Sequence, residues 1–566
     1  MSQSDQFNGR LGLSFASIGA AIGTGNIWRF PRMVGANGGG TFLIPWLIFL
    51  FAWSIPLVIA EYAMGTRSRT GPIGTFRIFA GRRFAWMGLW TAWISTAIGF
   101  YYAVVSGWTL KYFQLGITGA LNGEGVDTTE VWNAFLQSPG QVIFFQFIVI
   151  LLVLGTIWKG AKAIEKVNFY LMISLFALLF LTLFLSLWMD LSDGSLDGAL
   201  FMFTVDFDML MEPEVWINGL SQSAWSCSAG MGMCITYAVY MSKDEDTVLN
   251  AFTMGLANNS ISIIAGLAVL SAIFAVESDP LATVTGGSSA ITFLALPQVF
   301  AQAPGGAIGP LVMTAMFFLA LSFAALTSMI STVELCVRNF VDHGYDRERS
   351  VLITGLAIFI FGLPSAMLWI RLDNAGVAFP EFLEVQDHIW GYGLMFSGLF
   401  IAFSIWKYGY IKWRAAVDEG TAPPGFAGYL GLGVSAFRDD FINTGDNDIE
   451  VGRWWDVLIY VAFPVLFFIL MASYFSDMIA NTPNVWDPSN PKGLSIILLF
   501  WGVVAALFIA LNRKLIERPL YRNVPEGADA DISELPGGSD ELVGQVGDVI
   551  VGFEHLSDSI DAELAD

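Results

Sequence analysis

The chain has 566 residues, of which 55% are hydrophobic and only 13% are charged, and its mean hydropathy is +0.61. This composition excludes a water-soluble globular protein. Because an apolar run of roughly 20 residues spans a bilayer, a chain of this length has room for about a dozen spans and modest loops.

The formal net charge of −22 is unevenly distributed. Residues 523–566 carry 12 Asp and Glu and no Lys or Arg, so more than half of the excess belongs to the C-terminal tail. Phosphate contacts need cations, so the acid excess argues against a nucleic-acid partner. The 9 Lys against 18 Arg, together with the acid excess, are typical of a halophile's proteins.

All three cysteines lie in apolar segments, which argues against a disulfide framework or a zinc site.

Apolar runs bounded by glycine, proline and charged residues predict twelve membrane spans. They cover residues 11–34, 41–64, 87–112, 141–158, 167–190, 215–240, 248–276, 308–341, 350–370, 388–406, 454–476 and 494–512. The first residues lack the basic region of a cleaved signal peptide, so we expect the first span to be retained.

The distribution of Lys and Arg predicts a multi-pass protein of the cell membrane with both termini in the cytoplasm. With the N terminus inside, only three of the 27 cations, Lys111, Arg371 and Lys492, fall in outer loops. Arg29 and Arg32 fall in the first span, and all the others lie inside.

Two of the predicted spans are interrupted by small residues. They are GAAIGTGN at 19–26 in span 1 and SCSAGMG at 226–232 in span 6. If spans 1–5 and 6–10 are inverted repeats, each repeat begins with a discontinuous helix, which marks the binding site of a transporter near the membrane midplane. A single glycine of this kind is more often a helix-packing residue. Two clusters in corresponding positions, each with polar neighbours, favour the binding site.

Several motifs resemble the neurotransmitter:sodium symporter family, in its prokaryotic amino-acid transporter branch. They are RLGL at 10–13, GTGNIWRFP at 23–31, NGGGTFLIP at 37–45, EYAMG at 61–65, IEK at 164–166, PEVW at 213–216, Thr236-Tyr237, Asn258 and ALTS at 325–328. The resemblance covers roughly residues 10–515. It implies an all-α polytopic membrane protein with the LeuT fold: a 5+5 inverted repeat with discontinuous spans 1 and 6, about 12 transmembrane helices in all, and sodium-driven alternating access.

On this basis the chain divides into five parts. They are an N-terminal cytoplasmic segment (1–10), a transporter core (11–406, with repeats at about 11–190 and 215–406), a cytoplasmic loop (407–453), spans 11–12 (454–515) and an acidic cytoplasmic tail (516–566).

The resemblance implies two sodium sites, built from the carbonyl, hydroxyl and amide oxygens that a hard cation prefers. The first comprises the carbonyl of Ala21, the side chains of Asn26, Ser226 and Asn258, and the substrate carboxylate, which couples ion to substrate. The second comprises the carbonyls of Gly19, Ile22 and Ala324 and the hydroxyls of Thr327 and Ser328. The alternatives are that Asn26 is a helix-packing amide and that the two hydroxyls bond back to carbonyls one turn earlier.

The resemblance also places the substrate. Its carboxylate would meet the backbone N–H groups of Thr24 and Gly25, at the positive end of a half-helix, and the phenol of Tyr102. Gly23 stands where monoamine transporters of the family carry Asp, so an amino acid that brings its own carboxylate is favoured. The ammonium would face carbonyls of Ala21 and Trp225, near Ser226 and Ser228.

The side-chain pocket resembles one lined by Ile98, Trp225, Met231, Ser328 and Thr332. Met231 replaces the Phe of a Gly-Phe-Gly pattern, and a flexible thioether tolerates varied shapes. We therefore expect a bulky apolar or aromatic amino acid.

The outer gate of the family matches Arg29 and Asp387, with Tyr102 and Trp225 as the apolar lid beneath. An Arg within a span is costly and usually paired. By resemblance, the intramembrane acid Glu61 would accept hydrogen bonds from the unwound backbone near residues 230–232.

The inner gate departs from the family pattern. Tyr240 and Asp342 match, but the N-terminal Arg that would pair with Asp342 falls at Ser4, and Val239 replaces a usual Ser. We therefore expect inner closure to rest on other contacts. The intramembrane acid Glu334 has no predicted partner.

A chloride site is an open hypothesis. Many prokaryotic members carry an acid where this chain has Ser262, as in chloride-dependent animal relatives. Gln222, Ser226, Asn258 and Ser262 would hold the chloride, whose charge replaces the missing carboxylate, but Trp46 stands where a Tyr ligand is expected.

Two further questions stay open at this point. Apolar residues recur at threes and fours over 542–564, which predicts an amphipathic helix in the tail, although a solvated, disordered tail fits equally. The leading hypothesis is a sodium-coupled symporter, and the alternative is a non-transporting sensor or interaction protein with the same fold. An enzyme is poorly supported, because the three histidines lie in loops or the tail and no nucleophile–base or metal-ligand grouping occurs.

Overall fold

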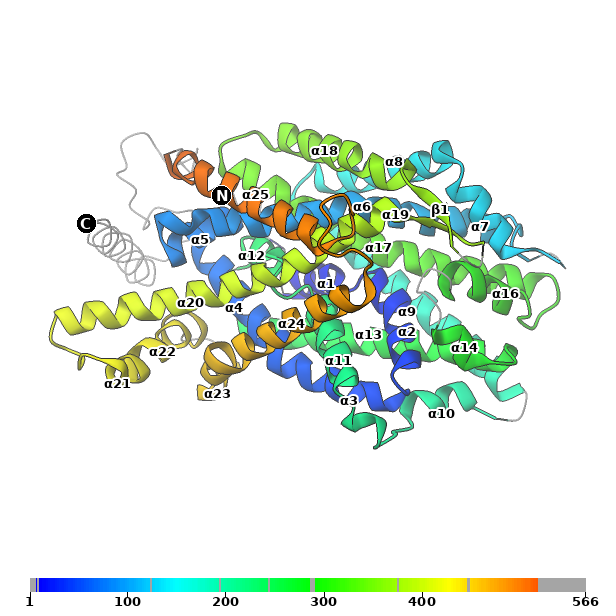
Figure 1. Cartoon of the computed structure of the whole chain (residues 1–566), viewed down its shortest axis with the longest axis horizontal. Coiled ribbons are helices and arrows are strands. Elements are labelled where there is room, and N and C mark those ends of the chain that lie inside the picture. Colours follow the sequence, from blue (N-terminus) through cyan, green and yellow to red (C-terminus); the bar gives the residue numbers. More distant parts are fainter. Residues whose placement is uncertain are drawn as a thin grey trace.

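The computed structural model describes residue 7 and residues 10–122, 125–192, 195–242, 245–285, 291–373, 376–444 and 448–517. In this part of the chain, long helices run roughly side by side, and the one sheet is a two-stranded hairpin (Figure 1). The amphipathic helix predicted in the tail lies outside the described residues.

Ten helices of the described chain are long and apolar enough to cross a membrane. They cover Gly40–Ser68, Arg82–Ile117, Pro139–Ile157, Ala161–Ser192, Thr247–Val276, Ile308–Asp342, Arg347–Met367, Glu381–Asp418, Arg453–Asn481 and Leu494–Leu515. Each corresponds to a predicted span, and the two predicted spans that remain are the broken ones. The helical membrane fold predicted from the sequence is therefore confirmed.

The two broken spans are built from short helices. In the first span these are α1 (Arg10–Ala21), the π-helical turn η2 (Gly25–Arg29) and α2 (Phe30–Ala36), and in the sixth α11 (Pro213–Ser226) and α12 (Met233–Ala238). Gly230 (φ +87°) and Gly232 (φ +77°) take left-handed conformations in the second break, which glycine adopts without a steric cost.

The remaining elements follow in chain order. They are α3 (Gly40–Phe49), η3 (Leu50–Ser54), α4 (Ile55–Ser68), α5 (Pro72–Ala80), η4 (Arg82–Phe84), α6 (Ala85–Ile117), α7 (Thr128–Leu136), α8 (Pro139–Ile157), α9 (Ala161–Ser192), α10 (Asp197–Phe203), η5 (Met209–Met211), α13 (Thr247–Val276), α14 (Pro280–Thr285), η6 (Ile291–Ala295), α16 (Leu296–Phe300), α17 (Ile308–Asp342), α18 (Arg347–Met367), β1 (Ile370–Leu372), β2 (Ala378–Pro380), α19 (Glu381–Gln386), η7 (Asp387–Gly391), α20 (Tyr392–Asp418), α21 (Phe426–Gly428), η8 (Tyr429–Gly433), α22 (Val434–Phe437), η9 (Arg438–Ile442), α23 (Arg453–Val457), η10 (Leu458–Ala462), α24 (Phe463–Asn481) and α25 (Leu494–Glu517).

The first broken span lies inside the bundle, where α1 packs against α9, α13, α17 and α12. The backbones of α4 and α12 approach closely, since a Cβ on Gly65 would lie 2.3 Å from the carbonyl oxygen of Ile235. Both breaks are thus enclosed by other helices, which is the only place where unwound backbone is tolerated at membrane depth.

The tenth span is longer than predicted. Residues 381–418 form one continuous helix, whereas hydropathy predicts a span only over 388–406. The extension is held by the segment that follows it, which folds back along α20 (Figure 1). The Tyr408 hydroxyl donates to Asp440 (2.6 Å) and the Trp413 indole to the carbonyl of Pro423 (3.2 Å).

The two ends of the bundle are named by the orientation that the sequence predicts. The inner end contains Arg69, Lys159 and Arg347, and the outer end contains Arg371 and Lys492.

Candidate functional site

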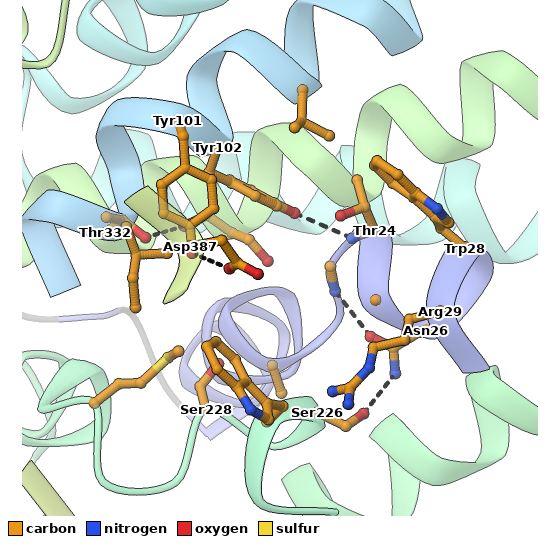
Figure 2. Close-up of a pocket in the computed structure, with 18 of the residues that line it drawn as sticks. Thr24, Asn26, Trp28, Arg29, Tyr101, Tyr102, Ser226, Ser228, Thr332 and Asp387 are labelled. Atoms are coloured by element: carbon orange, nitrogen blue, oxygen red, sulfur yellow. Dashed lines mark hydrogen bonds between the residues drawn. The ribbon is translucent and has the colours of Figure 1, made fainter. Parts of the chain in front are cut away.

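A cavity of about 360 Å³ lies between the two helix breaks (Figure 2). Its walls come from the break after α1, from α6, from the break after α11, from α17 and from the segment β2–α19–η7. The structure places every residue of the predicted substrate site on its lining: Ala21, Thr24, Gly25, Ile98, Tyr102, Trp225, Ser226, Ser228, Met231, Ser328 and Thr332.

One end of the cavity carries the groups predicted for a carboxylate. The backbone N–H of Thr24 donates to the Tyr102 hydroxyl (3.0 Å), so the phenol stands beside the first turn of η2. A Cβ on Gly23 would lie 2.9 Å from Ser328 Oγ and 3.0 Å from the Tyr102 oxygen. A side chain at position 23 would therefore press against two hydroxyl groups.

Asn26 joins the two halves of the first predicted sodium site. Its Nδ2 lies 2.8 Å from Asn258 Oδ1, 2.8 Å from Ser262 Oγ and 3.3 Å from Ser226 Oγ, and Asn258 Nδ2 donates to Ser226 Oγ (2.9 Å). All these side chains are buried. The structure thus brings the three side-chain ligands together, and Ala21 lines the adjoining cavity.

The second predicted sodium site lies where α1 ends against α17. The Ile22 carbonyl accepts from Ser328 Oγ (3.0 Å) and Thr327 Oγ (3.4 Å), and Thr327 also bonds back to the carbonyl of Ala324 (3.0 Å). A Cβ on Gly19 would lie 3.2 Å from Thr327 Cβ. All five predicted residues therefore meet, and neutral oxygens of this kind suit a hard cation.

The outer gate residues lie on the same cavity but bind different partners. Arg29 donates to Ser221 Oγ (3.0 Å), while Tyr101 donates to Asp387 Oδ1 (2.7 Å). No ion pair joins Arg29 to Asp387 in the described part of the chain. Figure 2 shows Asp387 beside Tyr101 and Arg29 beside Asn26, on different sides of the cavity.

Glu61 binds the unwound backbone at the break in the sixth span. Its Oε1 accepts from the backbone N–H of Gly230 (2.5 Å), and the side chain is fully buried. The carboxyl thus binds the unwound segment where the resemblance places it.

At the inner end, Glu334 has the partner that sequence reading did not find. Its carboxylate accepts from both terminal nitrogens of Arg347 (3.1 and 2.6 Å) and from the Tyr240 hydroxyl (2.5 Å). Arg347 also donates to the carbonyl of Ile157 (2.8 Å). This network links the turn after α12, α17, α18 and the end of α8.

The inner residue Asp342 pairs within its own helix. Arg338, one turn earlier, lies 2.5 Å from Asp342 Oδ1, and the N–H of Gly71 donates to Oδ2 (2.6 Å). Tyr240 does not bond Asp342, but the Arg338 guanidinium lies 5.8 Å from its ring centroid. Ser4 lies outside the described residues.

Sequence reading missed several residues around the cavity and at the inner end. They include Tyr101, Ser221, Val105, Trp108, Leu383, Arg338 and Arg347. Only Arg338 carried a local signal, because a cation and an acid four residues apart lie on one helix face.

Comparison with known proteins identifies the family. Residues 4–138 and 136–427 match a model of the Sodium:neurotransmitter symporter family. The sodium-dependent transporter YhdH of Bacillus subtilis is 31% identical over 415 residues, which cover 71% of this chain and 88% of YhdH. A sodium-dependent transporter of Methanocaldococcus jannaschii is 30% identical over 509 residues, which cover 84% of this chain and 90% of that transporter.

A solved structure has the same architecture. MhsT in complex with L-phenylalanine matches with a TM-score of 0.65 and 28% identity, covering 83% of this chain and 99% of MhsT. The fold is therefore the LeuT fold, and the protein is a multi-pass, sodium-coupled membrane transporter rather than an enzyme. The chain belongs to the sodium:neurotransmitter symporter family.

Proposed function

We propose that this transporter imports a hydrophobic or aromatic amino acid together with two sodium ions by alternating access, with both termini in the cytoplasm. The main support for this proposal is the chemistry of the cavity lining. At one end it offers the backbone of Thr24 and Gly25 and the Tyr102 hydroxyl, which suit a carboxylate. Because position 23 is glycine, this end of the cavity has no acidic side chain that could bind the amine of a substrate lacking a carboxylate.

Other residues of the cavity lining favour an apolar side chain. Ile98, Met231 and Trp225 line the cavity, and the charged residues among its described lining are Arg29 and Asp387. The solved relative MhsT holds L-phenylalanine. The side chains of Ile98, Met231 and Trp225 offer no positive charge to a second carboxylate, which disfavours glutamate.

The first sodium site adjoins the substrate end of the cavity. Asn26 is hydrogen-bonded to Asn258 and Ser226, and its Oδ1 accepts the N–H of Gly23 beside the carboxylate position. A sodium ion among these groups would share the substrate carboxylate as a ligand. Ion and substrate would then each favour binding of the other.

The test is uptake into liposomes that contain the purified protein, with an imposed sodium gradient and labelled L-phenylalanine. Unlabelled leucine, tryptophan, alanine, glycine and glutamate serve as competitors. We expect sodium-dependent uptake that leucine and tryptophan suppress and glutamate does not. Uptake without sodium would contradict the coupling, preference for glutamate or glycine would contradict the substrate class, and binding without uptake would favour a sensor.

Removing the Tyr102 hydroxyl should weaken substrate binding. We expect Tyr102→Phe to raise KM for L-phenylalanine uptake about tenfold or more, because a hydrogen bond to a charged group contributes about 1.5–3 kcal/mol. Tyr112→Phe on the same helix is the matched control, since the Tyr112 hydroxyl is buried with no partner among the described residues. An unchanged KM in Tyr102→Phe would remove the phenol from the site.

We further propose that chloride binds beside the first sodium site. Asn26 and Asn258 already bond Ser262 and Ser226 there, and the buried Gln222, whose amide NH2 can donate to an anion, lines the adjoining cavity. The Trp46 indole N–H is likewise buried without an acceptor in the described chain, so it is available to an anion in place of a Tyr hydroxyl.

Chloride dependence has a direct test. We expect replacing chloride by gluconate to lower sodium-driven uptake by wild type, and Ser262→Glu to abolish that dependence because its carboxylate supplies the negative charge. Ser262→Ala removes the same hydroxyl without adding charge, so its uptake should stay chloride-dependent. Undiminished wild-type uptake in gluconate would exclude the chloride site.

A further inference from the structure

The outer wall of the cavity is held from outside by the last two helices. We call residues 378–391, which form β2, α19 and η7, the outer wall, and residues 463–517 the α24–α25 hairpin. The outer wall contributes Phe379, Pro380, Leu383 and Asp387 to the cavity lining. Three residues of the hairpin contact either the outer wall or Ser221, which binds Arg29. None of the three lines the cavity.

Lys492, in the loop between α24 and α25, binds three residues of the outer wall. Its ammonium is hydrogen-bonded to Glu384, lies 3.5 Å from Glu381 and sits 5.0 Å from the centroid of the Phe379 ring. Arg371 reaches the same Glu381 from β1 (2.8 Å). Single exposed ion pairs contribute little, but Lys492 is only 25% exposed and belongs to a network.

Trp501 on α25 holds the wall at a second point. Its indole N–H donates to the carbonyl of Ile389 (2.7 Å), and both residues are buried. Ile389 lies in η7, where the π-helical turn disrupts the regular register of backbone hydrogen bonds. The indole therefore fixes the turn that begins at Asp387.

Tyr474 on α24 reaches the other side of the gate. Its hydroxyl is 2.7 Å from Ser221 Oγ, which accepts from Arg29. Its ring also stacks on Tyr392, directly after the wall, with centroids 4.6 Å apart. One hairpin thus touches Ser221, the partner of Arg29, and the turn that contains Asp387.

We propose that the α24–α25 hairpin positions the outer gate, with Lys492, Trp501 and Tyr474 as positioning residues. The proposal rests on the gate role proposed for Arg29 and Asp387. Lys492 and Trp501 hold the wall so that Leu383 and Asp387 face the substrate, and Tyr474 holds Ser221 and through it Arg29. Spans 11 and 12 are then part of the transport machinery.

The experiment uses the full chain in liposomes with Leu383→Cys as a reporter, labelled from outside by a membrane-impermeant maleimide. The protein without the reporter is the blank for its three native cysteines, of which Cys227 and Cys234 are buried. We expect Lys492→Ala to raise the labelling rate at least about threefold and KM for L-phenylalanine about three- to tenfold, with kcat within about twofold.

Conservative variants separate positioning from misfolding. Lys492→Arg keeps the charge and should stay near wild type. Trp501→Phe keeps an aromatic side chain but removes the N–H together with part of the indole, and it should change both readouts as Lys492→Ala does. Lys111→Ala is the matched control, because this outer cation contacts Gln114 and the Phe145 ring instead of the wall.

The outcomes distinguish this proposal from the proposed function. Unchanged labelling and KM in both Lys492→Ala and Trp501→Phe would overturn the positioning role. Absence of phenylalanine uptake by wild type would contradict the substrate class, and unchanged uptake by Asp387→Asn would contradict the gate. In either case the labelling rates at position 383 still decide whether the hairpin holds the wall.

Discussion

Asn26→Ala should reduce sodium-driven uptake at least about a hundredfold, the largest effect that we expect from a single substitution. Asn26 is 1% exposed, and its amide bonds Asn258, Ser262 and Ser226 while its oxygen accepts the N–H of Gly23. Truncation removes a proposed sodium ligand and leaves several buried groups unsatisfied, each at about 1–3 kcal/mol. Initial uptake of labelled L-phenylalanine against sodium concentration measures the loss.

A second buried amide controls for stability. Asn37, 3% exposed, bonds the carbonyl of Met33 and the side chain of Asn218 (both 2.8 Å), away from the cavity. Asn37→Ala should lower Tm in detergent about as much as Asn26→Ala does and keep sodium-driven uptake. If uptake by Asn26→Ala stayed within about tenfold of wild type, Asn26 would be a helix-packing amide and not a sodium ligand.

The helix breaks were predictable because their chemistry is local. Small residues cluster in two short runs, and backbone freed at membrane depth must bind something. Once the runs are assigned to spans 1 and 6, the residues beside them follow from contiguous motifs. Asn26 and the hydroxyls at 327 and 328 were predicted by the resemblance of their motifs to the family, and the structure brings them to the positions described.

Partners that lie far apart in the chain were not predictable. Arg29 binds Ser221 and Asp387 binds Tyr101, although hydropathy and motif spacing contain nothing that joins these positions. The π-helical turn beginning at Asp387 accepts a hydrogen bond from Trp501 of α25, a contact that no local propensity specifies.

Hydropathy also misplaces charged residues at helix ends. It begins the ninth span at residue 350 and thereby assigns Arg347 to a solvated loop, whereas α18 begins at Arg347. It ends the tenth span at residue 406 for the same reason, although the helix continues to Asp418. Charges that are paired within the protein are not excluded from a helix, so a scale based on transfer to lipid shortens such helices.

Arg347→Ala should cost about 3 kcal/mol of stability, because breaking a buried ion pair leaves an uncompensated charge. Glu334 is fully buried, and the substitution would leave it only the Tyr240 hydroxyl. Unfolding in mixed micelles of detergent and SDS measures the difference. Arg349→Ala is the matched control, since Arg349 is exposed and contacts only the Tyr345 ring among described groups.

The charge explanation has its own test in a double variant. Glu334→Gln in the Arg347→Ala protein removes the unpaired carboxylate and keeps an acceptor for Tyr240, so most of the lost stability should return. The same network joins the turn after α12, α17, α18 and the end of α8. Restored stability would show that the loss in Arg347→Ala comes from the unpaired charge of Glu334. A double variant as unstable as Arg347→Ala alone would instead assign the loss to the bonds from Arg347 to the Ile157 carbonyl.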